Sequence, residues 1–245
     1  MAPALVLLHG FTHTGASWDP VRAALGERYR ALSPDIRGHG SASARLPVTL
    51  DAVIDDVTAA APERFTLCGY SMGGRIALHV ALAAPARVER LVLIGASPGI
   101  ASEAERSERL AADRRLADEI ERSSIEEFAN RWASTPVLGG QPDAVVAAAH
   151  ADRLRSTPAG LAAALRGLGT GALPPVWDRL GELAMPVVLV VGERDSKFLG
   201  VAAQIGARIA RSTRVVVPGA GHAVHLEAPE AVAGVLLGNE GADSG

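Results

Sequence analysis

The sequence predicts an α/β fold: a mostly parallel sheet flanked by helices, with an all-helical insertion. Three observations predict it. Short apolar runs rich in Val, Leu and Ile recur along the chain, Ala-rich helical patterns alternate with them, and the alternation stops between residues 101 and 183. Continuous apolar runs are typical of parallel strands that are buried on both faces. Strands that alternate with helices join into a parallel sheet through right-handed crossovers.

The individual elements follow from these patterns. Strands are predicted at residues 4–9, 29–34, 65–70, 89–96, 185–192 and 213–219. Helices are predicted at residues 18–25, 50–61, 73–85, 200–210 and 229–237. Asp19 stands before Pro20 and is expected to cap the first of these helices, while Pro229 opens the last.

The break in the alternation predicts the domain organisation. Between residues 101 and 183, charged helical segments follow one another without a strand-like run. We expect this stretch to form a helical cap over the carboxyl ends of the sheet, and residues 1–100 and 184–240 to form the α/β core. The last residues, 241–245, read as a flexible tail.

Composition excludes several classes of function. The chain has 245 residues, of which 48% are hydrophobic and 21% charged, as in a globular protein with a sizeable core. A net charge of −3 gives no global positive field for nucleic acid. No run of 18 apolar residues and no basic leader occurs, so neither membrane insertion nor export is expected.

Neither a metal nor a cofactor is expected. The single cysteine, Cys68, can form no internal disulfide and offers no thiol pair for zinc, which fits a reducing, cytoplasmic location. The seven histidines show no H-E-x-x-H spacing, and no phosphate-binding or dinucleotide-binding loop is present. The sequence assigns no oligomeric state.

The strongest motif is Gly-Tyr-Ser-Met-Gly at residues 69–73, a G-x-S-x-G pattern between a predicted strand and a predicted helix. That context is required for a nucleophile elbow, in which a tight strand-to-helix turn exposes the serine hydroxyl. Gly69 and Gly73 would let the strand and the helix approach closely. Ser71 is therefore the predicted nucleophile.

Two further residues follow in the chain order acid, then histidine. Asp195 comes after the predicted strand at 185–192, and His222 comes after the strand at 213–219. A carboxylate on one loop can orient an imidazole on the next and stabilise it once it has taken a proton from Ser71. His225 is a competing candidate, ranked below His222 because two glycines frame the latter.

The loop after the first strand carries His-Gly-Phe at residues 9–11. The backbone N–H groups of Phe11 and of Met72, the residue after the serine, are the expected donors of an oxyanion hole.

These motifs, with Asp-Ile-Arg-Gly-His-Gly at residues 35–40, resemble the α/β-hydrolase superfamily over nearly the whole chain. A closer resemblance is to the 2-succinyl-6-hydroxy-2,4-cyclohexadiene-1-carboxylate synthases of menaquinone biosynthesis. It rests on residues 69–75, 131–136, 154–156 and above all Gly-Glu-Arg-Asp-Ser-Lys-Phe at 192–198. One departure stands out, because His13 and Thr14 occupy positions where smaller or more apolar residues are expected.

The resemblance implies a lyase that eliminates pyruvate from 2-succinyl-5-enolpyruvyl-6-hydroxy-3-cyclohexene-1-carboxylate. A substrate with three carboxylates needs cations in its pocket. The residues expected to supply them are Arg75, Arg109, Arg155 and Lys197. The residues expected to line the ring and succinyl pocket are Tyr70, Trp132 and Phe198.

Three alternatives remain open. The base that removes the proton next to the succinyl ketone could be Ser71, with its own proton relayed to His222, or His222 itself. The same triad would also serve a carboxylic-ester hydrolase that forms an acyl-enzyme on the serine. A binding protein without catalysis is disfavoured, because it would have no need of Ser71, Asp195 and His222 together.

Overall fold

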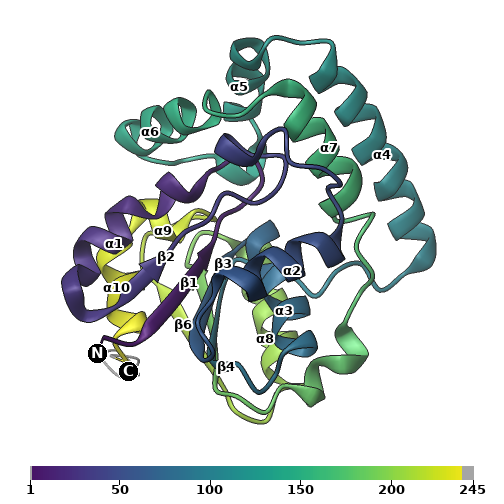
Figure 1. The fold of residues 1–245 in the computed structure, drawn as a ribbon. Coiled ribbons are helices and arrows are strands. Elements are labelled where there is room, and N and C mark those ends of the chain that lie inside the picture. The colour runs from purple at the N-terminus through teal and green to yellow at the C-terminus, as the bar shows by residue number, and fades with distance from the viewer. Residues whose placement is uncertain (1, 239–245) are drawn as a thin grey trace.

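Six parallel strands form a single sheet in the order β2-β1-β3-β4-β5-β6 (Figure 1). The structure is a computed structural model and describes residues 2–238. The strands are β1 (Ala4–Leu8), β2 (Arg30–Leu32), β3 (Phe65–Tyr70), β4 (Val88–Ile94), β5 (Val187–Gly192) and β6 (Ser212–Val217). Every strand of this sheet therefore ends at the same edge.

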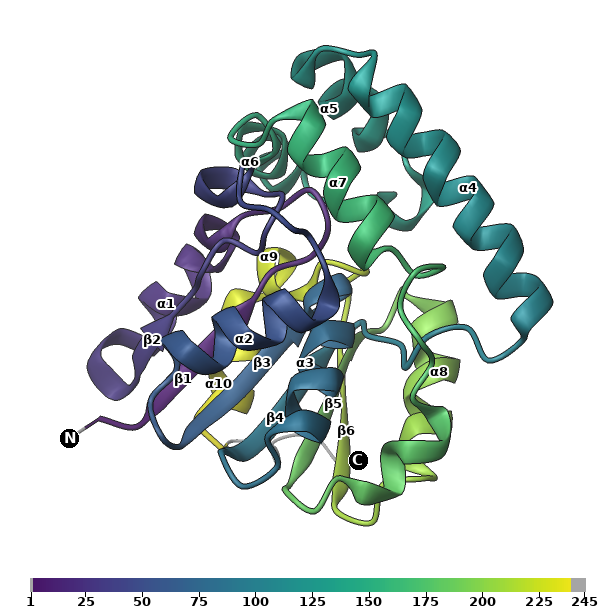
Figure 2. The same ribbon diagram turned by 45° about the vertical axis from the view of Figure 1, so that its right-hand side comes forward.

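Helices cover both faces of the sheet because its central strands are apolar on both faces. Leu5 and Leu7 belong to one buried cluster, whereas Val6 and Leu8 belong to the other, as the two-residue period of a strand requires. The first cluster packs against α1 (Asp19–Leu25), α9 (Val224–Glu227) and α10 (Pro229–Leu236). The second packs against α2 (Leu50–Ala60), α3 (Met72–Ala83) and α8 (Ser196–Gly206), seen in front of the sheet and at its right in Figure 2.

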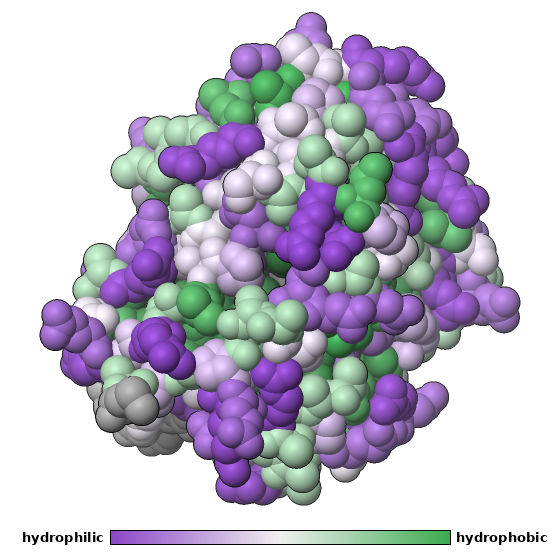
Figure 3. Space-filling model, in the orientation of Figure 1, coloured by the Kyte–Doolittle hydropathy of each residue, from purple (hydrophilic) through white to green (hydrophobic). Residues whose placement is uncertain are grey.

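The segment between β4 and β5 forms a helical cap beyond the carboxyl edge of the sheet (Figures 1 and 2). Its helices are α4 (Glu103–Glu121), α5 (Ile125–Ala133), α6 (Asp143–Arg153) and α7 (Pro158–Leu168). A small apolar cluster that includes Ile120, Phe128 and Leu161 holds α4, α5 and α7 together. The outer face of α4, at the upper right of Figure 3, is hydrophilic, as its charged sequence predicts.

The predicted fold class is confirmed, and each of the six predicted strands overlaps an observed one. Two predicted helix starts were wrong. Asp19 is the first residue of α1 instead of its cap, and its carboxylate pairs with Arg22. Helix α8 begins at Ser196, four residues early, because the Asp195 side chain caps it by accepting a hydrogen bond from the Phe198 amide.

Short 3₁₀ turns complete the fold at Gly15–Trp18, Gly26–Arg28, Gly40–Ala42, Pro136–Leu138 and Trp177–Glu182. The predicted tail at residues 241–245 lies outside the described residues. Among residues 2–238, no helix has the length and apolar character needed to cross a bilayer.

Candidate active site

Ser71 occupies a sharp turn between β3 and α3. Its φ of 51° and ψ of −110° place it in a region that non-glycine residues rarely adopt. A side chain on Gly69 would overlap the backbone of Gly73, and a side chain on Gly73 would overlap the carbonyl of Leu8. The two glycines therefore permit the close packing of β1, β3 and α3 that holds the strained serine in place.

Ser71, His222 and Asp195 lie in one hydrogen-bonded chain. His222 Nε2 is 3.1 Å from Ser71 Oγ, and His222 Nδ1 is 2.6 Å from Asp195 Oδ2. With the proton on Nδ1, the imidazole donates to Asp195 and accepts from the Ser71 hydroxyl. All three come from loops or turns that follow strands β3, β5 and β6, so the parallel sheet brings them to one edge. This arrangement can take a proton from the serine or from a substrate.

His225, the competing histidine, lies apart from this chain. Its side chain is fully buried, with ring centroids 4.2 Å from Tyr70 and 4.8 Å from Trp18. Neither ring nitrogen has a hydrogen-bond partner among the described residues, and burial lowers the pKa of the ring well below its ordinary value. His225 is a neutral packing residue beneath the site.

The two predicted oxyanion donors flank the serine from different elements. Met72 is the first residue of α3, where helix N–H groups have no acceptor within the helix and the helix dipole is positive. Phe11 lies in the loop that follows β1, and Ser71, Met72 and Phe11 all line one cavity. An oxyanion bound near Ser71 would therefore meet two elements that can stabilise negative charge.

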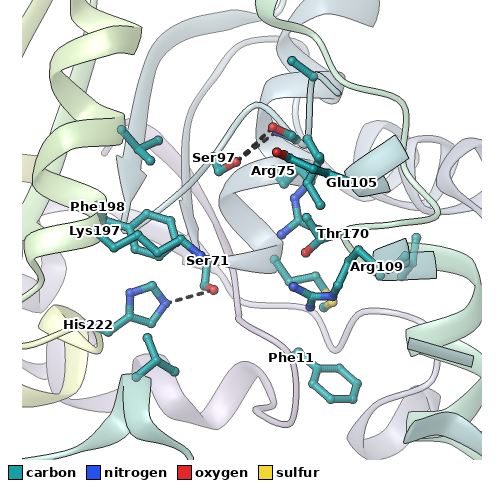
Figure 4. Close-up of a pocket in the computed structure, with 18 of the residues that line it drawn as sticks. Phe11, Ser71, Arg75, Ser97, Glu105, Arg109, Thr170, Lys197, Phe198 and His222 are labelled. Atoms are coloured by element: carbon teal, nitrogen blue, oxygen red, sulfur yellow. Dashed lines mark hydrogen bonds between the residues drawn. The ribbon is translucent and has the colours of Figure 1, made fainter. Parts of the chain in front are cut away.

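This cavity lies between the core and the cap and has a volume of about 1000 Å³ (Figure 4). Ser71 and His222 open into it. Among the residues predicted to bind substrate, those that line it are Arg75, Arg109, Trp132, Lys197 and Phe198. Its size suits a substituted ring with several side groups.

The cavity contains cations with few anionic partners. Arg75 is only 8% exposed, and its Nε has no hydrogen-bond partner among the described residues. Burial and then the nearby charge of Arg109 lower the Arg75 pKa to about 10. Arg109 donates from Nε to Asp113 Oδ1 at 2.7 Å, and Asp113 also accepts from the Gly171 amide. A bound anion would therefore relieve the cost of burying the Arg75 charge.

Aromatic rings form the remaining walls near the triad. Phe198 lies 4.6 Å from the His222 ring, and the Lys197 ammonium lies 5.6 Å from the centre of the Phe198 ring. Trp132 of the cap packs edge-on against Phe11 with centroids 5.3 Å apart. The Phe198–His222 and Trp132–Phe11 contacts each join residues from different elements that line the cavity.

Two predicted substrate ligands do not line this cavity. Tyr70 is 3% exposed and belongs, with Cys68, to the cluster against α1 and α10, and its ring centroid lies 5.3 Å from that of His222. Arg155 lies beyond the end of α6, where its side chain is 64% exposed and faces a separate hollow beside Asp19 and Asp35. The structure thus leaves three of the four predicted cations in the cavity.

The cavity also contains residues that the motifs did not indicate. They include Ser97, Glu105, Thr170, Trp177, Gln204 and Arg208. Ser97 follows β4 at the same sheet edge as the triad, and that position is the one signal that could have identified it from the sequence. Arg208 lies 5.3 Å over the Trp177 ring, a contact that depends on tertiary packing alone.

The part of the chain from residue 2 to residue 238 contains no group of three or more His, Cys, Asp or Glu side chains that could hold a metal ion.

A family model described as the alpha/beta hydrolase family matches residues 5–235. The chain belongs to this family. The 2-succinyl-6-hydroxy-2,4-cyclohexadiene-1-carboxylate synthase of Salmonella paratyphi C is 34% identical to the chain over 239 residues, which cover 94% of this chain and 91% of the relative. Both predicted resemblances, to the family and to these synthases, are confirmed.

Solved structures of similar proteins share the fold of this chain. The structure of MenH from S. aureus matches with a TM-score of 0.89 and 30% identity, covering 96% of this chain and 92% of that one. A thermophilic esterase from Thermogutta terrifontis, solved with malate bound, matches with a TM-score of 0.82 and 25% identity, covering 97% of this chain and 89% of that one. Lyases and esterases thus share this fold, and the contents of the cavity must distinguish them.

Proposed function

We propose that the protein is a carbon–oxygen lyase of menaquinone biosynthesis. It eliminates pyruvate from 2-succinyl-5-enolpyruvyl-6-hydroxy-3-cyclohexene-1-carboxylate and leaves 2-succinyl-6-hydroxy-2,4-cyclohexadiene-1-carboxylate. The observation that carries this proposal is the cationic wall that the buried Arg75 and the partly exposed Arg109 place in the cavity of Ser71 and His222. Synthases of this name are its relatives at 33–34% identity.

The charge of the cavity selects for a polyanionic substrate. Arg75 contributes a buried guanidinium to the cavity wall, and such a group can bind a carboxylate through two parallel hydrogen bonds. Arg109 has one N–H engaged with Asp113 and keeps its other donors for a ligand. Lys197 adds a compact positive charge beside the triad.

The reaction begins with removal of the proton next to the succinyl ketone. The Ser71 oxygen accepts this proton after giving its own to His222, and Asp195 stabilises the resulting imidazolium. The ketone becomes an enolate, whose oxygen accepts hydrogen bonds from the Phe11 and Met72 amides. One such donor contributes on the order of 3 kcal/mol of transition-state stabilisation.

Collapse of the enolate completes the elimination. The electron pair moves through the ring to form the conjugated diene, and the carbon–oxygen bond to the enolpyruvyl group breaks. Enolpyruvate leaves and becomes pyruvate on protonation. No covalent bond to Ser71 is needed, so the serine acts on a proton while the arginines hold the carboxylates.

A carboxylic-ester hydrolase is the second candidate, and the match to an esterase of 25% identity favours it. In that reaction Ser71 would attack the ester carbonyl and water would release the acyl group. An esterase for neutral substrates gains nothing from the buried charge of Arg75, because an unpaired buried cation is costly.

The experiment that tests the proposal measures pyruvate release from freshly generated substrate, with the enzyme-free elimination rate subtracted. Catalysed release that saturates with substrate is the expected result. Release at the enzyme-free rate would contradict the proposal.

A further inference from the structure

His13 and Thr14, the two unexpected residues after Phe11, both bind one carboxylate of the cap. The Thr14 amide donates to Asp152 Oδ2 at 2.9 Å, and His13 Nδ1 lies 3.2 Å from the same oxygen. The Thr14 hydroxyl donates to Asp152 Oδ1. Asp152 stands near the end of α6, 138 residues away along the chain. The two unexpected residues, His13 and Thr14, therefore share a specific hydrogen-bond acceptor in the cap, Asp152.

Asp152 is an ionised group in a nearly closed site. It is 7% exposed, and burial alone would raise its pKa, but the hydrogen bonds from His13 and Thr14 outweigh burial and lower the pKa to about 2. Charge-assisted hydrogen bonds of this kind are short and strong. The Arg155 Nε lies 3.9 Å from Asp152 Oδ1 at the exposed side.

The loop held by Asp152 does not have a relaxed backbone. Thr12 has a φ of 71°, in the left-handed region that a β-branched residue strongly disfavours. Its hydroxyl accepts a hydrogen bond from Arg153 Nε at 3.3 Å, and the His13 amide donates to Gly10 O at 3.2 Å. Two consecutive residues of α6 thus hold three consecutive loop residues, directly after Phe11.

We propose that Asp152 is a positioning residue that sets the direction of the Phe11 amide, and so couples the cap to the oxyanion hole. The inference rests on the proposed function, which gives the Phe11 amide its catalytic role. Asp152 does not line the substrate cavity, so it acts only through the loop. Its loss lowers the rate of the chemical step and leaves substrate binding unchanged, because an enolate forms only during reaction.

The test compares Asp152→Asn with Asp143→Asn, an exposed aspartate at the start of the same helix. Asp152→Asn should lower kcat for pyruvate release about tenfold or more and keep KM within about twofold, as expected for a displaced oxyanion donor. Asp143→Asn should leave both unchanged. Circular dichroism and thermal unfolding identify a temperature at which both variants are folded, and the kinetics are compared at that temperature.

A second pair of variants distinguishes a positioning role of the Asp152 interaction from a purely structural one. Thr14→Val removes the hydroxyl donor at nearly constant volume, whereas Thr14→Ser keeps it. We expect Thr14→Val to lower kcat, and to lower it less in the Asp152→Asn background than in the parent. Both changes break the Thr14–Asp152 interaction, and only Thr14→Val also removes the acceptor of the Ala16 amide. Thr14→Ser should restore kcat to within about twofold of the parent.

Hydrogen exchange tests the inference without measuring catalysis. Peptides that cover residues 10–18 should exchange faster in Asp152→Asn than in Asp143→Asn, since the Thr14 amide loses its carboxylate acceptor. Unchanged exchange overturns the inference, and so does a normal kcat, or a raised KM at normal kcat, in Asp152→Asn. If the parent releases no pyruvate but exchange responds as expected, the proposed function fails and the link between cap and loop stands.

Discussion

Arg75 and Arg109 place two like charges on the same wall of the cavity, and the charge of Arg109 adds to burial in lowering the Arg75 pKa to about 10. The Nε of Arg75 has no partner among the described residues. Asp113, which pairs with Arg109, offsets part of this repulsion, and an anion bound in the cavity would offset more of it. The relationship ties the cavity to a carboxylate substrate more directly than the triad does.

Replacing Arg75 with Ala should therefore weaken substrate binding. We expect KM for the tricarboxylate to rise about tenfold or more, since a charged hydrogen bond contributes about 1.5–3 kcal/mol. Arg155→Ala is the matched control, because its side chain lies outside the cavity. Steady-state kinetics checks both variants, and equal KM values would show that Arg75 does not bind substrate.

Replacing Ser71 with Ala should abolish elimination but not binding. The change removes the hydroxyl that lies 3.1 Å from His222 Nε2, and with it the proton path, while Arg75 and Arg109 remain. We expect kcat to fall at least about 1,000-fold, as in other triads. Isothermal titration with the product diene should give a dissociation constant within about threefold of the parent. A variant that retained near-parental kcat would favour His222 as the immediate base.

Much of this site could be predicted from the sequence because its parts are local. Each triad residue follows an apolar strand, and parallel strands bring their carboxyl ends to one edge, so Ser71, Asp195 and His222 could be assigned from motif and order. The six strands were recognisable for the same reason. The glycine pattern around Ser71 needs no knowledge of distant contacts.

The residues that were misplaced depend on orientation and tertiary packing. Tyr70 adjoins the nucleophile in sequence, but its side chain is buried in the cluster against α1 and α10 and does not line the cavity. Arg155 belongs to the segment at residues 154–156 that resembles the synthases, yet it lies past the end of α6 and faces solvent. Asp152 gave no signal at all, because its partners lie 138 residues away and only the fold brings them together.

The elbow glycine offers a stability test. Gly73→Ala would drive a methyl group into the carbonyl oxygens of Leu8 and His9, backbone atoms that cannot move cheaply. We expect the free energy of unfolding to fall by about 2–4 kcal/mol. Gly234→Ala, in α10 with open space at its Cβ, should raise it by about 0.5–1 kcal/mol. Urea denaturation measures both, and equal effects would contradict the packing described around Ser71.

Acid should destabilise the fold partly through His9. This ring is fully buried, its Nε2 accepts from the Ile36 amide at 2.9 Å, and burial lowers its pKa from 6.5 to about 4. Above pH 6.5 the ring is neutral in both states. Between pH 6.5 and 4 the unfolded chain binds a proton that the native state does not, so stability falls as pH falls, by about 2 kcal/mol at pH 5 for this group.

Urea unfolding at pH 7.5 and 5.0 measures this loss. His9→Gln removes the titrating group and should show a loss smaller than that of the parent by about 2 kcal/mol. Equal losses in parent and variant would show that His9 does not titrate in this way. The comparison uses only the change in the free energy of unfolding between the two pH values. It therefore remains valid even if His9→Gln is less stable than the parent at both.

The most direct test of the lyase activity measures pyruvate release from freshly generated 2-succinyl-5-enolpyruvyl-6-hydroxy-3-cyclohexene-1-carboxylate beside hydrolysis of a short p-nitrophenyl ester. The parent, Ser71→Ala and Arg75→Ala proteins are compared in both assays. We expect fast pyruvate release by the parent, loss of it in both variants at low substrate concentration, and negligible ester cleavage. Vigorous ester cleavage, with pyruvate released only at the enzyme-free rate, would contradict the lyase proposal and make the protein a hydrolase.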